Sequence, residues 1–347
     1  MGDCLCVAAQ LQMFVQAQER NQVFLESMRE KVRGQGMRIA CPEGTEERVV
    51  IAAAQVRDQE WGKPVLMGEK FAIEAVAEKV HVDLHGIELH DPARDSQFDQ
   101  YVETYFQLRK DKGISKEQAQ EKIRMPHYFA ASMLRANAVD GVVCGLNSAT
   151  KPFVPAFEII QMQEGFRKVS SLFVLEWPER FLFFADCAVN KNPDAQGLAD
   201  IAHATAQTVR TFGYEPRIAF LSFSTHGSAS GPEVEKVQEA FKISKKEGLD
   251  CIYDGELQFD AALLPDVARR KTPDSPFAQE GANVFIFPDL NSGNIAYKIT
   301  ERLGKALATG PILQGLKQPI NDVSRGCTAE GFANVMVLTA AQALFMR

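Results

Sequence analysis

A serine and an arginine stand side by side near the carboxyl end of the chain, in the segment Asn321-Asp322-Val323-Ser324-Arg325-Gly326-Cys327-Thr328. A hydroxyl can donate a hydrogen bond to a developing oxyanion, and a guanidinium can bind a phosphate through two parallel N–H groups. The glycine after Arg325 frees the backbone to approach a ligand. These residue types suit binding of a phosphate or polarisation of a carbonyl group.

Three other loops follow expected strands and lead into expected helices, where free backbone N–H groups favour anions. Residues 42–48 end with Arg48 on a first helical turn, although a surface arginine beside a helix cap is the commoner use of this pattern. Residues 222–230 are rich in small side chains and include His226 and Ser228, but they lack P-loop spacing, and a flexible connection explains them equally well. Residues 287–294 contain Asn and Ser that can simply cap a helix.

The candidates for a metal site are weak. Residues 254–260 carry three carboxylates that could bind Mg²⁺, yet helix capping and surface solvation rank above that interpretation. The chain has 7 cysteines, an odd and scattered set without a C-x-x-C pair, and its 6 histidines are dispersed. We therefore expect reduced thiols in a cytoplasmic protein and no structural zinc.

Strands and helices alternate along the chain. Short apolar strands are expected at residues 37–41, 64–67, 139–144, 217–223 and 284–287, and helices separate them. This order predicts an α/β protein with mostly parallel sheets. At about 150 residues per domain, 347 residues predict two domains.

The overall charge excludes some partners. The net charge is −7, which has the wrong sign for a general nucleic-acid binder, so any anionic ligand must meet a local group of cations. No apolar stretch is long enough to span a bilayer. Residues 11–33 read as an amphipathic surface helix. Residues 1–22 read as an N-terminal extension, in which a frayed helix is favoured over acylation of Cys4 and Cys6.

Several long motifs occur together in one order: PEGTEERV, LRKDKG, ADCAVN, LSFSTHGSA, DGELQFDAAL, NVFIFPDLNSGNIAYKI, GPILQGL and PINDVSRGC. From about Phe24 to Leu344 the chain resembles the phosphotransacetylases (phosphate acetyltransferases) of the phosphate acetyl/butyryl transferase family. The resemblance implies two α/β domains of the isocitrate and isopropylmalate dehydrogenase type, with the active site in the cleft between them. Domain I would comprise residues 1–165 and 311–347, and domain II, inserted and dimer-forming, residues 166–310.

The resemblance implies a reaction as well. Acetyl-CoA and phosphate would give acetyl phosphate and CoA, reversibly, without a metal or other cofactor, in a cytoplasmic homodimer with no nucleic-acid or membrane partner. Ser324 and Arg325 are the implied catalytic pair, with Glu330 as a candidate base. The implied substrate-binding residues are Arg48, Arg109, Lys151, Ser228 and Asn321.

The chain departs from the family pattern at three positions. The family usually carries an aspartate base seven residues after the motif serine, where this chain has Gly331. The arginine of a Ser-Thr-x-Asp-Thr-Leu-Arg-Pro loop is Val154 here, which leaves Lys151 as a point charge without the fork of an arginine. The lysine of a Ser-Thr-Lys-Gly-Ser loop is His226, which could be a cation, a base or a neutral structural residue.

These departures leave two hypotheses. The chain is either an active phosphate acyltransferase, for acetyl or a longer chain such as butyryl, or a weakened or non-catalytic relative that binds CoA or an acyl phosphate. An NAD-dependent dehydrogenase of the related fold is poorly supported, because no G-x-G-x-x-G follows an expected strand.

Overall fold

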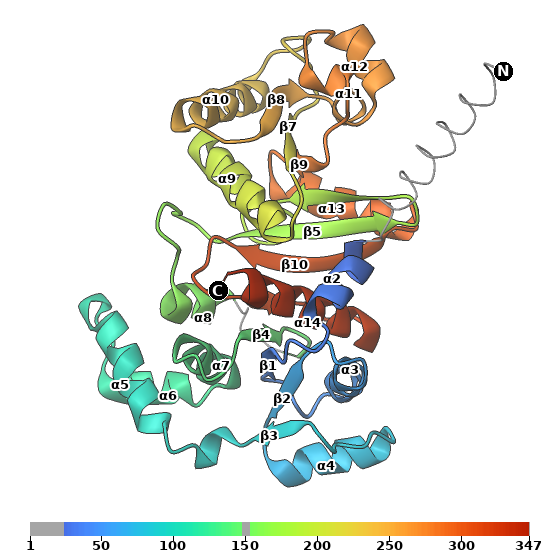
Figure 1. The fold of residues 1–347 in the computed structure, drawn as a ribbon. Helices are drawn as coiled ribbons and strands as arrows, with labels where there is room; N and C mark the ends of the chain where they lie inside the picture. Colours follow the sequence, from blue (N-terminus) through green and yellow to red (C-terminus); the bar gives the residue numbers. More distant parts are fainter. Residues whose placement is uncertain (1–23, 148–152, 347) are drawn as a thin grey trace, which may run out of the picture.

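The strands form two separate sheets in the computed structural model, which describes residues 24–147 and 153–346 (Figure 1). The first sheet has the strand order β11-β4-β1-β2-β3, and every neighbouring pair in it is parallel. Its strands are β1 (Arg38–Cys41), β2 (Lys63–Met67), β3 (Glu88–His90), β4 (Gly141–Cys144) and β11 (Ile320–Asp322).

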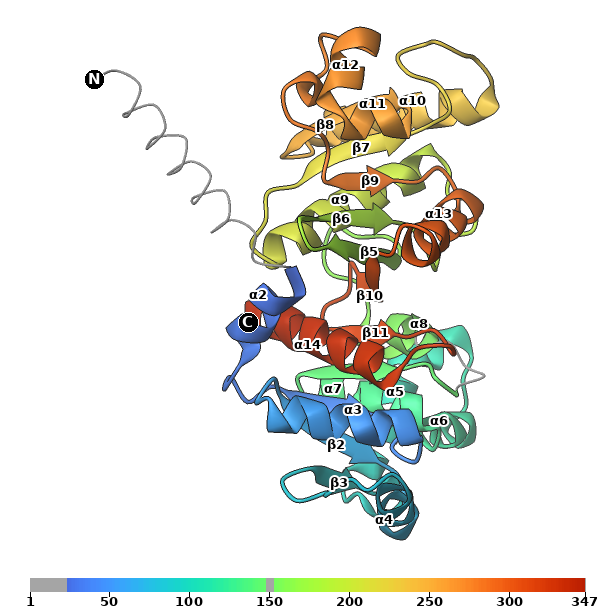
Figure 2. The same ribbon diagram turned by 90° about the vertical axis from the view of Figure 1, so that its right-hand side faces the viewer.

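Helices cover both faces of the first sheet (Figures 1 and 2). Ile39 and Cys41 pack in one core cluster with α3 and α14, whereas Ala40 packs on the opposite face with α5 and α7. This alternation is the two-residue period of a strand that is buried on both sides. The helices of this unit are α3 (Glu47–Asp58), α4 (Lys70–Lys79), α5 (Phe98–Arg109), α6 (Lys116–Ile123), α7 (Pro126–Arg135), α8 (Phe153–Pro155) and α14 (Ala329–Phe345), with short turns η1 (Pro92–Arg94), η2 (Lys110–Lys112) and η3 (Ala156–Ile160).

The second sheet is mixed. Its order is β10-β5-β6-β9-β7-β8, in which β5 runs antiparallel to both of its neighbours, β10 and β6, and the remaining neighbouring pairs are parallel. Its strands are β5 (Ser170–Trp177), β6 (Arg180–Ala185), β7 (Arg217–Leu221), β8 (Ile252–Leu257), β9 (Val284–Ile286) and β10 (Leu307–Gln314); its helices are α9 (Ala195–Thr211), α10 (Pro232–Glu247), α11 (Phe259–Leu263), α12 (Pro265–Lys271) and α13 (Leu290–Arg302), with the turn η4 (Pro276–Ala278). The predicted α/β class with mostly parallel sheets is confirmed.

Helix α2 (Phe24–Val32) bridges the two units, which corrects the expectation of a surface helix. The Phe24 ring is fully buried and lies 5.4 Å from the ring of Phe212, beside α9. On the other side, Arg29 donates a hydrogen bond of 2.9 Å to Asn334 of α14. The apolar face of α2 therefore belongs to a core that is continuous between the two sheets. Residues 1–22, with Cys4 and Cys6, lie outside the described residues.

Strand β10 crosses the predicted domain boundary at residues 310 and 311. It pairs with β5 on both sides of an irregularity between Thr309 and Ile312, so Leu313 and Gln314 still belong to the second sheet. The chain then enters the first sheet at β11. The division into domains stays a prediction, with β10 as the element that connects the two sheets directly.

The cysteines behave largely as small apolar side chains. Cys41, Cys144 and Cys187 are buried free thiols, whereas Cys251 is half-buried. Burial raises the pKa of the first three thiols above the ordinary value. Within the described ranges, no helix is long and apolar enough to cross a bilayer.

Candidate functional site

The candidate site lies where the strand order of the first sheet reverses. The chain passes from β1 outward to β2 and β3, and then returns to place β4 and β11 on the other side of β1. All these strands are parallel, so their carboxyl ends meet at one edge. Ligands of open α/β sheets bind at such a reversal, because the two loops diverge there and leave a crevice.

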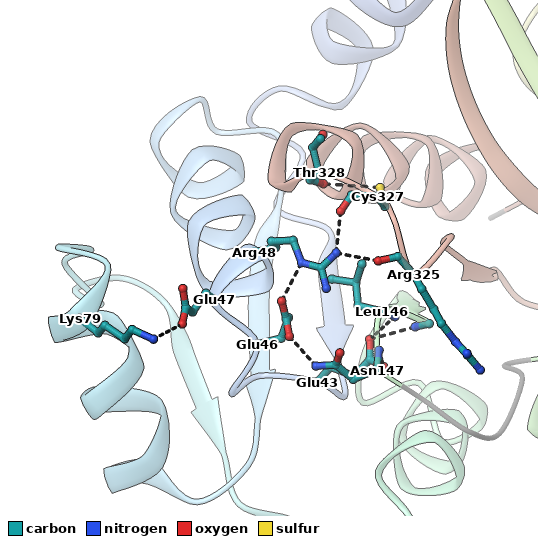
Figure 3. Close-up of polar contacts among 11 residues, drawn as sticks. Glu43, Glu46, Glu47, Arg48, Lys79, Leu146, Asn147, Arg325, Cys327 and Thr328 are labelled. Carbon is teal, nitrogen blue, oxygen red and sulfur yellow. Dashed lines mark hydrogen bonds and ion pairs between the residues drawn. The ribbon is translucent and has the colours of Figure 1, made fainter. Parts of the chain in front are cut away.

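Glu43 joins the two loops that diverge at this point. Its carboxylate, on the loop after β1, accepts hydrogen bonds of 2.8–2.9 Å from the backbone N–H groups of Gly145, Leu146 and Asn147 after β4 (Figure 3). Gly145 has a φ of +123°, and a Cβ there would lie 2.0 Å from an Asp322 carboxylate oxygen. Only glycine therefore allows the β4 and β11 loops to lie this close.

Arg48 holds the segment that contains the serine–arginine pair. Its Nη1 donates to the backbone oxygens of Arg325 (2.8 Å) and Cys327 (2.9 Å), and its Nε pairs with Glu46 at 2.7 Å (Figure 3). The hydrogen bond from Arg48 holds the pKa of Glu46 below its usual range. Asn147 also donates to Glu46. Arg48 thus connects α3 to residues 325–327, and direct contact between Arg48 and an anion stays a prediction.

Ser324 and Arg325 are exposed at the sheet edge, just before α14. The Ser324 oxygen accepts a hydrogen bond of 3.3 Å from the N–H of Gly326, which leaves its own hydrogen available as a donor. Figure 3 shows the guanidinium of Arg325 extending away from Arg48. The backbone of this segment is fixed while the two side chains face outward.

The first turn of α14 explains how the chain tolerates Gly331. Thr328 is the N-cap, and its hydroxyl accepts a hydrogen bond of 3.0 Å from the N–H of Gly331. That bond uses only the backbone of the third helical residue, so the cap does not need an acidic side chain there. Glu330 is exposed on the same turn. Burial raises the pKa of the Cys327 thiol to about 11, so this thiol stays protonated at neutral pH.

Restoring an aspartate at position 331 needs more than one change. A Cβ on Gly331 would lie 2.7 Å from the Cys327 sulfur, closer than real contacts allow. We expect Gly331→Asp in a Cys327→Ala background to raise kcat/KM for CoA by about tenfold or more over Cys327→Ala alone, because a carboxylate on this turn can accept the thiol proton. The isosteric Gly331→Asn in that background is the matched control. Equal rates for the aspartate and asparagine variants would contradict a missing base.

Arg109 and Ser228, two further predicted binding residues, lie on elements away from the Ser324 segment. Arg109 ends α5 and pairs with Glu158 at 3.2 Å. Ser228 is exposed on the loop after β7, in the second unit, where its oxygen accepts the N–H of Thr225. Lys151 lies outside the described residues. The geometry therefore brings Arg48, Ser324 and Arg325 together, and it places Arg109 and Ser228 on other elements.

Asn321 is in the core rather than on the crevice. It is fully buried, and its amide donates to Thr339 (2.8 Å) and Gln342 (2.7 Å) of α14. Its oxygen accepts the N–H of Leu313 from β10 at 2.7 Å. Through these bonds the Asn321 side chain connects β10, β11 and α14. Because its polar atoms are used inside the core, we do not include Asn321 among the proposed substrate ligands.

The histidine and the three carboxylates of residues 254–260 each contact polar groups of the second unit. The two ring nitrogens of His226 lie 3.1 Å from Asp254 and 2.7 Å from the Thr272 hydroxyl. Glu256 accepts from Ser224 and from the N–H of Gly227, and Asp260 pairs with Lys271. In the part of the chain that the structure describes, no group of three or more His, Cys, Asp or Glu side chains could hold a metal.

Sequence reasoning missed Glu43, Glu46 and Glu158. The first two belong to the PEGTEE motif, in which three carboxylates precede or open a helix. Carboxylates just before or at the start of a helix commonly accept hydrogen bonds from backbone N–H groups. This position in the motif is the sequence feature that could have identified Glu43 and Glu46. Which N–H groups Glu43 would meet depends on β4, about one hundred residues away.

The amino-acid sequence matches a known protein family over most of its length. The family model described as phosphate acetyl/butaryl transferase matches residues 23–340. A phosphate acetyltransferase from Bacillus subtilis (strain 168) is 43% identical over 319 residues, which is 92% of this chain and 98% of the relative.

Solved structures give the same result. A phosphotransacetylase from Streptococcus pyogenes superposes with a TM-score of 0.85 at 41% identity, over 92% of this chain and 98% of that one. A branched-chain phosphotransacylase from Enterococcus faecalis V583 has a TM-score of 0.65 at 14% identity, over 88% of this chain and 99% of that one, and shares the fold alone. These matches confirm the resemblance and the transferase class predicted from the sequence. The chain belongs to the phosphate acetyl/butaryl transferase family.

Proposed function

We propose that this protein catalyses the reversible transfer of an acetyl group between CoA and inorganic phosphate, without a metal or other cofactor in the reaction. The observation that carries the proposal is the exposed Ser324–Arg325 pair on a segment whose backbone Arg48 holds at two carbonyl oxygens. Family membership supports the same reaction class. The CoA thiol attacks the acetyl carbonyl, a C–S bond forms, and the C–O bond to phosphate breaks.

The roles follow from the chemistry of each group. The Ser324 hydroxyl donates to the oxyanion of the tetrahedral intermediate, and Arg325 binds the phosphate that leaves. Arg109 supplies a further cation. The proton of the thiol, whose ordinary pKa is about 8.5, passes to Glu330 or to solvent, because Gly331 offers no side chain. His226 is a weaker candidate, since both of its ring nitrogens contact groups of the second unit.

The test is a panel of acyl phosphates. CoA-dependent formation of acyl-CoA is measured with acetyl, propionyl and butyryl phosphate, and the Ser324→Ala variant sets the background. We expect the highest kcat/KM with acetyl phosphate. A preference for butyryl phosphate would assign a longer acyl chain, and no turnover above background with any of the three would favour a non-catalytic relative.

We further propose that the protein is a cytoplasmic homodimer that associates through its second unit. Three exposed apolar side chains follow one another at four-residue spacing, Ile295 and Ile299 on α13 and Leu303 directly after it, and their exposed fractions are 56%, 53% and 80%. Such a stripe on a single helix face is typical of a surface that becomes covered. Light scattering should give twice the mass of the chain, and Ile299→Glu should shift the protein toward monomer. A wild-type mass equal to one chain would contradict this proposal.

A further inference from the structure

Glu158 gathers three hydrogen-bond donors at one carboxylate. Tyr105 and Tyr128 donate their hydroxyls to its Oε2 at 2.8 and 2.9 Å, and Arg109 donates from Nη2 to its Oε1 at 3.2 Å. The tyrosines come from α5 and α7, and their rings contact each other edge to face at 5.6 Å. Both are almost fully buried. The carboxylate is therefore held by two buried side chains, and the arginine is its partly exposed partner.

The backbone beneath Glu158 is irregular. Residues Ala156–Ile160 form a π turn directly after α8, and Arg135 donates to the carbonyl of Ile159 at 2.8 Å, which fixes the end of this turn. Such turns redirect a side chain relative to a regular helix and are frequent at functional sites. Here the turn places an acidic side chain toward the end of α5.

Arg109 and Glu158 line a cavity of about 420 Å³, together with two lysines and a second carboxylate, Lys112, Lys122 and Glu121. The side chains of Arg109 and Glu158 are 25% and 19% exposed, so both reach this cavity without being surface groups. A single Arg109 donor is engaged by Glu158, and a guanidinium has five N–H donors. Within residues 24–147 and 153–346, Glu158 is the one hydrogen-bond partner seen for Arg109, so its other N–H donors can meet an anion in the cavity. Helix α8 contacts β11, which leads to Ser324.

We infer that Glu158 is a positioning residue: held by Tyr105 and Tyr128, it orients the guanidinium of Arg109 toward the phosphate group of the substrate. The inference rests on the proposed function, in which Arg109 binds an anionic substrate group. Glu158 does not itself touch the reacting atoms. Its effect on substrate binding acts through Arg109.

The test is a double-mutant cycle on the KM for acetyl phosphate. We expect Glu158→Ala to raise this KM about tenfold, the loss typical of one charge-assisted hydrogen bond, with kcat within about threefold of wild type. In Glu158→Gln the amide oxygen can still accept from both tyrosines, but the NH2 group then faces Arg109 and cannot accept its N–H, so the KM for acetyl phosphate should rise as it does in Glu158→Ala. In an Arg109→Ala background, Glu158→Ala should have no further effect.

Controls separate this role from a structural one. Tyr105→Phe and Tyr128→Phe should each raise the KM by about threefold, whereas Tyr101→Phe, a buried tyrosine on the same helix α5, should not change it. Thermal unfolding identifies any variant that fails to fold, and Glu158→Gln then carries the comparison.

The possible failures are distinguishable. An equal KM increase from Glu158→Ala with and without Arg109 would overturn the positioning role, and so would a lower KM in Glu158→Ala. If Arg109→Ala alone leaves the KM unchanged while the enzyme turns over acetyl phosphate, then Arg109 binds no substrate anion and the inference fails with that assignment. Absence of turnover in the wild-type protein would instead be a failure of the proposed function.

Discussion

Replacing Ser324 with alanine is expected to lower kcat by about one hundred to one thousandfold, which is the usual loss when one oxyanion donor is removed. The KM for acetyl phosphate should change little, because Ser324 acts mainly on charge that develops in the transition state. The measurement is steady-state acetyl-CoA formation with CoA and acetyl phosphate.

A lower kcat identifies Ser324 as an oxyanion donor only when folding and substrate binding are unchanged in the variant. Among the residues that the structure describes, the interaction lost in the ground state is the 3.3 Å bond that Ser324 accepts from the N–H of Gly326, a small contribution in an exposed turn. We expect an unchanged melting temperature and unchanged CoA affinity by calorimetry. A Ser324→Ala enzyme with a wild-type kcat would remove Ser324 from the mechanism.

Replacing Arg48 with alanine is expected to lower kcat/KM by about one hundredfold or more, because its guanidinium holds the backbone of the segment that contains Ser324 and Arg325. The change removes two hydrogen bonds that hold Arg325 and Cys327, and it breaks the ion pair with Glu46. A misplaced catalytic segment can cost about one hundredfold when its displacement reaches one ångström. Arg48→Lys should not restore activity, since an ammonium lacks the planar fork that reaches both Glu46 and the two carbonyls.

The chain offers a matched control on the same helix. Arg57, near the carboxyl end of α3, also donates to two backbone oxygens, those of Asp83 and His85. Arg57→Ala therefore removes a similar interaction at the opposite end of the helix. Its kcat/KM should stay near that of wild type. If Arg57→Ala and Arg48→Ala lost activity equally, the effect would reflect α3 as a whole rather than the segment that contains Ser324.

Tertiary structure also sets the protonation state of His127, a buried residue near the site. His127 of α7 is buried, and its Nε2 lies 3.9 Å from an oxygen of Glu43. Burial lowers the pKa of His127, so the imidazole is neutral at pH 7 and leaves Glu43 free to accept the three N–H groups after β4. The residue type alone would equally well have predicted a cation here.

Local patterns in the sequence were sufficient for most elements of the fold. Strands β1, β4 and β9 all lie within the apolar runs in which the sequence predicts strands. Strand β10 was missed, because Gly310 and Pro311 interrupt an apolar run and Pro is rare inside sheets. The irregularity in its pairing with β5 accommodates these two residues.

The sequence by itself determined the fold class, the family and the Ser324–Arg325 pair, because these depend on residue types and on spacing within short segments. Only the tertiary structure decided which side chains meet. It gave Arg48 backbone carbonyls as partners, buried Asn321 in a core network, and joined Arg109 to Glu158 across about fifty residues of chain. The physical reason is that a hydrogen bond depends on distance and direction, and between residues far apart in sequence these are set by the packing of the sheets and helices.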